Sequence, residues 1–275
     1  MLPVQNDLIF DIGCHIGQDS DFYLAMGYRV IGVEANPTLA EDLRVKFSEE
    51  INSGKFTLLE VAITSDGKPA IFFENPIASE WSTTVASWAN RRDHQFGSVS
   101  NSFEVPGISV KTMIETYGCP DYMKVDIEGS DFLCLQQLED CDTKPSYVSI
   151  ESTKYSFVGL LKEFVLFRKL GYDRFAVVDQ RRHSAKEFQT LKNIPLEYTF
   201  EVDSSGSFGR QLDGIWTGSI RAILKYVPIF FLYKAIGDDT ILPKIMSRIP
   251  IAKIILQYFQ KKNGWYDTHA KHKSV

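Results

Sequence analysis

Residues 8–17, LIFDIGCHIG, decide the fold of this chain. The run from Leu8 to Asp11 is short, apolar and ends in a carboxylate, which predicts a buried strand. Gly13 and Gly17 follow, and glycine lets the backbone turn tightly and approach a ligand closely. A strand that passes through a glycine turn into a helix predicts a ligand site at the carboxyl edge of a parallel sheet.

Strand and helix patterns alternate along the rest of the chain, apart from an irregular stretch at 64–110. The further predicted strands cover residues 29–35, 55–63, 121–129, 146–152, 173–179 and 196–202. This alternation predicts an α/β fold: a doubly wound, mostly parallel seven-stranded sheet with helices on both faces. Helical patterns after the last strand predict a C-terminal helical extension. We therefore predict a main domain at 1–217 and the extension at 218–275.

Charge is distributed unevenly along the 275 residues, whose formal net charge is -5. From residue 221 to the end, 10 Lys and Arg stand against 3 Asp and Glu, so the preceding part carries -12. An acidic body of this kind does not fit a nucleic-acid-binding protein. The four cysteines form no C-x-x-C pair, which predicts reduced thiols. No basic residue precedes Arg29, which disfavours a secretory signal, so we predict a cytoplasmic protein.

Acidic residues gather at or near the ends of the predicted strands. They are Asp11, Glu34, Glu60, Asp126 and Glu151. Because the carboxyl ends of parallel strands meet at one edge of a sheet, we expect these side chains to line one crevice. A crevice lined by carboxylates favours a positively charged ligand.

The glycine turn favours one of two nucleotide classes. It has the form G-x-x-x-G, from Gly13 to Gly17, whereas a dinucleotide site typically has G-x-G-x-x-G. Asp11 would repel a pyrophosphate but attract the ammonium and sulfonium groups of S-adenosylmethionine. Glu34, at the end of the next strand, is placed to accept hydrogen bonds from both ribose hydroxyls. These features favour S-adenosylmethionine over NAD. The structural alternative is a glycine turn that only ends the strand, with Glu34 capping the next helix.

Several motifs resemble a known family. FDIGCHIGQDSDFYLAMGYRVIGVEANP at 10–37 is similar to the first motif of class I methyltransferases and its sequel, and YMKVDIEGSDFLCLQQL at 122–138 resembles the K-[IV]-D-[IV]-E-G signature of the FkbM family. EWSTT at 80–84, the 204–216 stretch and WYDTHA at 265–270 extend the resemblance over nearly the whole chain. The resemblance implies S-adenosylmethionine-dependent O-methylation of sugars, glycans or natural products. Most members have Asn where this chain has His15.

Asp126 and Glu128 are the expected catalytic pair. Asp126 ends the strand predicted to lie beside the first strand, and in an extended segment Glu128 would point the same way. The pair would act as general base and orienting group for an acceptor hydroxyl. Alternatively, Asp126, Glu128 and Glu151 would hold a divalent cation, Mg or Ca, that lowers the pKa of that hydroxyl. His15, on the glycine turn, is a third catalytic candidate, and a plain turn residue is the alternative.

Other residues are weaker candidates. Ser82 is expected on the cofactor side of the site, and Glu60 is expected to contact adenine. A loop around Ser205 and Phe208 is expected to cover the pocket. A basic cluster suited to an anionic acceptor, or to a solvated surface, consists of Arg91, Arg92 and His94.

The sequence therefore predicts an S-adenosylmethionine-dependent O-methyltransferase that acts on a hydroxyl of a sugar, glycan or glycosylated small molecule. Two alternatives are a cofactor-binding partner protein without transferase activity and an NAD-linked sugar-modifying oxidoreductase. The predicted partner is the acceptor molecule, with no nucleic acid. The basic and apolar extension suits peripheral contact with a membrane, or packing on the domain or on a second copy in a homo-oligomer.

Overall fold

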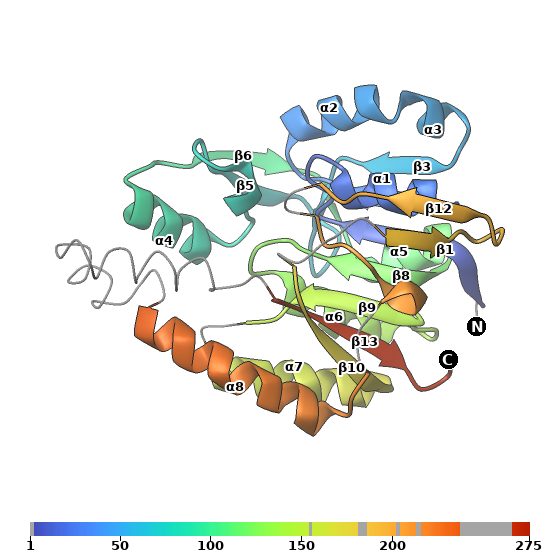
Figure 1. Cartoon of the computed structure of the whole chain (residues 1–275). Helices are drawn as coiled ribbons and strands as arrows, with labels where there is room; N and C mark the ends of the chain where they lie inside the picture. Colours follow the sequence, from blue (N-terminus) through green and yellow to red (C-terminus); the bar gives the residue numbers. More distant parts are fainter. Residues whose placement is uncertain (1–2, 154–155, 181–185, 202–203, 213–215, 237–265) are drawn as a thin grey trace.

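The computed structural model describes residues 3–153, 156–180, 186–201, 204–212, 216–236 and 266–275 (Figure 1). A seven-stranded sheet runs through its centre in the order β10-β13-β9-β8-β1-β2-β3. These strands are Tyr172–Asp179, Tyr266–His272, Tyr147–Glu151, Cys119–Val125, Val4–Ile12, Arg29–Val33 and Phe56–Leu59, in that order. Pairing is parallel except at β13, which is antiparallel to both β9 and β10.

Eight α-helices are described, and they cover both faces of the sheet. They are α1 (Gln18–Ala25), α2 (Pro37–Lys46), α3 (Ser48–Asn52), α4 (Ala86–Phe96), α5 (Val110–Tyr117), α6 (Asp131–Gln137), α7 (Phe157–Leu170) and α8 (Ser219–Ile236). One core joins α5, α6, α7 and α8 to the sheet, and a second core lies on the side of α1 and α2. The predicted doubly wound α/β fold is confirmed.

The first strand shows how the sequence produces two cores. Successive side chains of a strand point to opposite faces, so Phe10 joins the core of α5 to α8 while Ile9 joins the core of α1. Both side chains are fully buried, and so is that of Asp11, the next residue of the strand. A strand buried on both faces has a continuous apolar run, which is why LIF was a dependable signal.

Three pairs of short strands lie outside the main sheet. β5 (Ala70–Glu74) pairs with β6 (Asn101–Val105), β4 (Ala62–Ile63) with β7 (Gly107–Ile108), and β11 (Lys186–Gln189) with β12 (Pro195–Tyr198). Three short 3-10 helices complete the described elements: η1 (Ser79–Trp81), η2 (Leu138–Asp140) and η3 (Gly209–Gln211). The irregular stretch at 64–110 thus contains β5, η1, α4, β6 and β7 (Figure 1).

The seventh strand of the sheet is not the one that the sequence indicated. Residues 196–202 were predicted to form it, but residues 195–198 pair with β11 in a separate hairpin. The position in the sheet is taken by β13, which lies between β9 and β10. Residues 267–270 are buried although three of them, Asp267, Thr268 and His269, are polar, and this polarity concealed the strand.

The C-terminal extension is therefore only partly helical. Residues 219–236 form α8 as predicted, whereas 266–272 form a strand of the main sheet, and the stretch between them lies outside the described residues. The division at residue 217 stays a prediction, as do membrane contact and homo-oligomer formation. Within the described part of the chain, no helix has the length and apolarity needed to cross a bilayer.

Candidate functional site

A cavity of about 490 Å³ opens at the carboxyl ends of the central strands. Its lining comes from the turn after β1, the end of β2, the turn after β8 and Glu151 at the end of β9. Residues 79–84 and Arg92 of α4 also line it. The volume lies within the range of roughly 300–1,000 Å³ typical of small-molecule sites. The predicted position of the site, at the edge where parallel strands end, matches this cavity.

Negative charge dominates the cavity lining. Six carboxylates line it: Asp19, Glu34, Glu80, Asp126, Glu128 and Glu151. The basic residues in the lining are Lys124, Arg92 and His15. A lining with this excess of carboxylates favours a ligand that carries positive charge.

The two glycines of the turn are required by the packing of the chain. Gly13 has a φ of +83°, and a Cβ there would come within 1.9 Å of the carbonyl oxygen of Asp126. Gly17 has a φ of +75°, and a Cβ there would come within 2.5 Å of the Phe47 ring. Gly13 lines the cavity whereas Gly17 does not. The predicted close approach of a ligand therefore applies at most to Gly13.

Glu34 lies where the sequence predicted, at the end of β2 on the cavity wall. Its Oε2 accepts a hydrogen bond from the backbone N–H of His15 at 2.9 Å, and its Oε1 accepts one from Asn36 at 2.8 Å. The side chain is buried, and burial raises the pKa of its carboxyl to about 7 although these N–H groups oppose the shift. Each carboxylate oxygen has a second lone pair that can accept a ligand hydroxyl.

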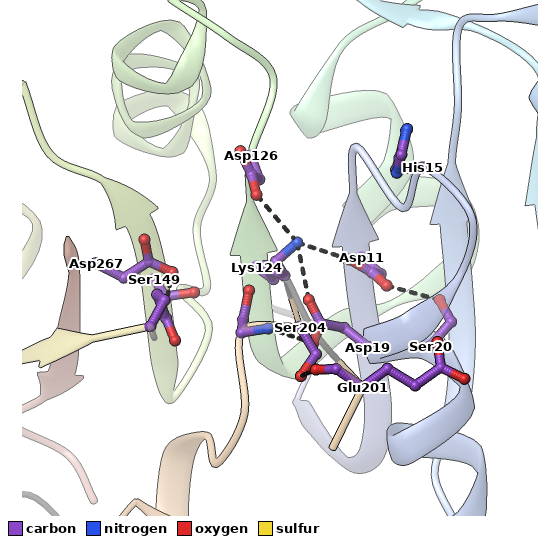
Figure 2. A network of polar contacts seen from close by, with 12 residues as sticks. Asp11, His15, Asp19, Ser20, Lys124, Asp126, Ser149, Glu201, Ser204 and Asp267 are labelled. Carbon is purple, nitrogen blue, oxygen red and sulfur yellow. Dashed lines mark hydrogen bonds and ion pairs between the residues drawn. The ribbon is translucent and has the colours of Figure 1, made fainter. Parts of the chain in front are cut away.

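A buried network links three aspartates to Lys124 (Figure 2). The Nζ of Lys124 lies 3.1 Å from Asp19 Oδ2, 3.4 Å from Asp126 Oδ2 and 3.9 Å from Asp11 Oδ1. Asp11 also accepts a hydrogen bond from the Ser20 hydroxyl at 2.6 Å. Burial opposes the charge on Lys124, but the surrounding aspartates raise the pKa of its ammonium well above the ordinary value.

Asp126 is the member of this network that the sequence assigned to catalysis, and it lines the cavity. Burial raises the pKa of its carboxyl, with the Glu151 charge adding to the shift and Lys124 opposing it. A carboxylate with a raised pKa is a better proton acceptor than one exposed to water. Its position and its pKa therefore suit general base catalysis.

Glu128 and His15 both occupy strained turns on the cavity wall. Glu128 has a φ of +39°, and its carbonyl oxygen accepts a hydrogen bond from the Thr83 hydroxyl at 2.7 Å. His15 has a φ of +50°, and its Nε2 lies 2.8 Å from the Ser79 hydroxyl. Burial lowers the pKa of the His15 imidazole, which favours the neutral ring. His15 thus connects the glycine turn to η1 across the cavity.

The three predicted metal ligands do not form a metal-binding group in the part of the chain that the structure describes. Asp126, Glu128 and Glu151 all line the cavity, but the described residues include no group of three His, Cys, Asp or Glu side chains able to hold a metal ion. Lys124 Nζ lies 3.4 Å from Asp126 Oδ2, so one of the three predicted ligands already faces a positive charge.

Of the remaining predicted site residues, Ser82 lines the cavity and most of the others lie away from it. Asp11 is fully buried beneath it, and Glu60 pairs with Arg44 of α2. Ser82 lines the cavity, and its hydroxyl accepts a hydrogen bond from the Asn75 N–H at 3.1 Å. The other predicted residues that do not line the cavity are Arg91, His94, Ser205 and Phe208.

The loop predicted to cover the pocket is packed beneath it instead. Phe208 is buried in the core of α1, with its ring centroid 4.7 Å from that of Tyr23 and 4.9 Å from that of Tyr122. The N–H of Ser205 donates to Asp19 Oδ1 at 2.7 Å. The loop therefore supports the start of α1 and does not form a lid.

Two functional candidates were not identified from the sequence. Asp19 was not among the candidates that the sequence indicated, yet it lines the cavity and contacts Lys124. Its position two residues after Gly17, at the start of the first helix, was the available signal. Trp81 lines the cavity as well, and Arg92 lies over its ring at 5.0 Å from the centroid.

Comparison with protein-family models gives a match that covers more than half of the chain. A family model described as "Methyltransferase FkbM domain" matches residues 11–174. No curated protein matches the sequence.

Similar solved structures are distant in sequence. Precorrin-6y C5,15-methyltransferase from Geobacter metallireducens shares 12% identity over 72% of this chain and 78% of that chain, with a TM-score of 0.33. The C-terminal domain of the Rhodobacter capsulatus enzyme of that name shares 12% identity over 72% and 77%, with a TM-score of 0.36. Precorrin 8w decarboxylase from Methanobacterium thermoautotrophicum shares 14% identity over 72% of this chain and 79% of that chain, with a TM-score of 0.35. Scores this low carry no argument about function.

Proposed function

The chain belongs to the FkbM methyltransferase family, and from this premise we propose that it transfers the methyl group of S-adenosylmethionine to a hydroxyl of a sugar, glycan or glycosylated small molecule. The observation that carries the proposal is the excess of carboxylates around one cavity at the carboxyl edge of the sheet. The family match disfavours the NAD-linked oxidoreductase that the sequence left open.

The residues present fit the cofactor. Glu34 has acceptor capacity left for the two ribose hydroxyls, and Asp19 offers a carboxylate to an ammonium group. The surplus of carboxylates compensates the positive charge of a sulfonium. When bound, S-adenosylmethionine supplies an electrophilic methyl group.

The acceptor side of the cavity suits a molecule rich in hydroxyls. Glu128 and Glu151 are carboxylates that accept hydrogen bonds from hydroxyl groups, and Trp81 provides an aromatic surface on which the C–H face of a sugar ring can pack. In this proposal the Asp126 carboxylate accepts the proton of the reacting hydroxyl as its oxygen attacks. General base catalysis of this kind contributes roughly 10²–10⁴ to a rate.

The test uses the purified protein, S-adenosylmethionine labelled in the methyl group, and a panel of neutral and acidic sugars and glycans. We expect label in an acceptor through an ether bond, which survives mild base. Label in a base-labile ester or on nitrogen would contradict O-methylation of a hydroxyl. Cofactor binding without transfer to any acceptor would favour the non-catalytic alternative.

A further inference from the structure

Lys124 is buried among more negative charge than it can neutralise. Its side chain is 6% exposed. The surrounding side chains are 0% exposed for Asp11, 7% for Asp19 and 19% for Asp126. Asp126 is the most exposed of the three carboxylates, and dashed lines in Figure 2 join the Lys124 ammonium to all three. Removing one partner from a buried ion pair is costly, so this arrangement strongly restrains the ammonium.

The backbone of Asp126 is fixed independently of its side chain. Its N–H donates to the carbonyl oxygen of Ile12 at 2.9 Å, at the end of β1. Its own carbonyl oxygen occupies the space left by the absent side chain of Gly13. Among the described residues, the side-chain contact that restrains the Asp126 carboxylate is the one to Lys124, whose Nζ lies 3.4 Å from Oδ2.

We infer that Lys124 is a positioning residue: its ammonium, held by Asp11 and Asp19, fixes the Asp126 carboxylate in the orientation that receives the acceptor proton. The inference rests on the proposed function, because it assigns Lys124 to the same reaction. Lys124 and Asp126 are two residues apart at the end of β8, so their side chains leave the sheet on the same side.

Two other roles for Lys124 predict different behaviour. A lysine that binds the cofactor directly would affect cofactor affinity. A lysine that only stabilises the fold would affect the unfolding temperature, and its effect on turnover would not depend on Asp126. A positioning lysine lowers turnover only while Asp126 is present to be positioned.

The experiment is a double-mutant cycle with K124M, D126N and the variant carrying both changes. Turnover is measured with saturating cofactor, and the Kd of S-adenosylhomocysteine is measured by calorimetry. We expect K124M to lower kcat on the order of a hundredfold, the cost of a small misplacement of a catalytic group. In the D126N background, we expect K124M to lower kcat by no more than about twofold, because the two residues act as a unit. The Kd should change by less than about threefold in each variant.

Controls separate this inference from folding defects. K169M removes a lysine of α7 that is 67% exposed and pairs with Glu139, and it should leave kcat unchanged. If K124M does not fold, K124Q takes its place in the cycle, because its amide carries no charge and its side chain is one atom shorter than that of lysine. K124Q should then lower kcat in the wild-type background but by no more than about twofold in the D126N background.

Three results would overturn the inference. Independent, multiplicative losses of kcat in the cycle would show that Lys124 does not act through Asp126. A large rise in the Kd with unchanged kcat would make Lys124 a cofactor ligand. A wild-type protein that binds cofactor but transfers methyl to no acceptor would overturn the proposed function itself, and it is recognised before any variant is made.

Discussion

Replacing Glu34 by alanine should weaken binding of S-adenosylmethionine about ten- to a hundredfold. Its carboxylate lines the cavity and has acceptor capacity for two ribose hydroxyls. Hydrogen bonds to a charged group contribute roughly 1.5–3 kcal/mol each. Water that enters the vacated space restores part of this energy, so we expect a net loss of about 1.4–2.8 kcal/mol.

Glu34 also holds two backbone groups, and the experiment has to separate that role from cofactor binding. Alanine leaves the N–H groups of His15 and Asn36 without their acceptor. The unfolding temperature of the E34A protein should therefore be measured beside its affinity. E34Q retains one acceptor oxygen and removes the charge, so it should fall between wild type and E34A in affinity.

The pH dependence gives a second readout of the same residue. Burial raises the pKa of Glu34 to about 7 in the folded protein, from an ordinary value of 4.5. The folded state therefore binds more protons than the unfolded state between these values, and stability of the free protein should fall as the pH rises from 5 to 7.5. E34Q should lose this part of the pH dependence. Affinity for a positively charged cofactor should rise over the same interval, as Glu34 ionises.

Isothermal titration calorimetry at pH 7.5, with thermal unfolding as the check on folding, measures these effects. E41A is the matched control, because Glu41 is an exposed carboxylate of α2 that does not line the cavity. A folded E34A protein with wild-type affinity would refute the assignment of Glu34 to the ribose.

Three further predictions concern the base, the glycine turn and the last strand. D126N should lower kcat by at least about a hundredfold with nearly unchanged cofactor Kd, since an amide cannot accept the proton; unchanged kcat in steady-state assays would remove Asp126 from the mechanism. G13A should lower the free energy of unfolding by at least about 2 kcal/mol, because φ is positive and the Cβ meets the carbonyl of Asp126; denaturant titration showing wild-type stability would contradict that geometry. Deleting residues 266–275 should abolish the cooperative unfolding transition, because β13 joins β9 to β10 in the sheet. An intact transition, followed by circular dichroism, would show that the strand is dispensable.

The central part of the fold could be predicted because its signals are local. The residues before Asp11 are continuously apolar, as expected for a strand that is buried on both faces. A glycine turn and a second apolar strand follow, and together these features predict a parallel sheet. Glu34 and Asp126 could be placed at the site for the same reason: strand ends in a parallel sheet share one edge. Glu128 also lines the cavity, but from a turn with a φ of +39° and not from the extended segment that the sequence predicted.

The remaining features depend on contacts between distant parts of the chain. The strand that contains Asp267 and His269 looks polar, and only the neighbouring strands β9 and β10 explain its burial. Gly17 is required because a Cβ there would meet the ring of Phe47, which lies 30 positions later in the chain. Asp126 is engaged by Lys124, and no spacing in the sequence distinguishes this ion pair from the metal ligation that was expected.

The most direct test of the central claim is a calorimetric titration of the folded wild-type protein with S-adenosylmethionine, and separately with NAD. The claim is that the carboxylate-lined cavity recognises a positively charged sulfur compound, so we predict saturable binding of one S-adenosylmethionine per chain and none of NAD. No binding of S-adenosylmethionine or S-adenosylhomocysteine to protein shown to be folded by circular dichroism would contradict it.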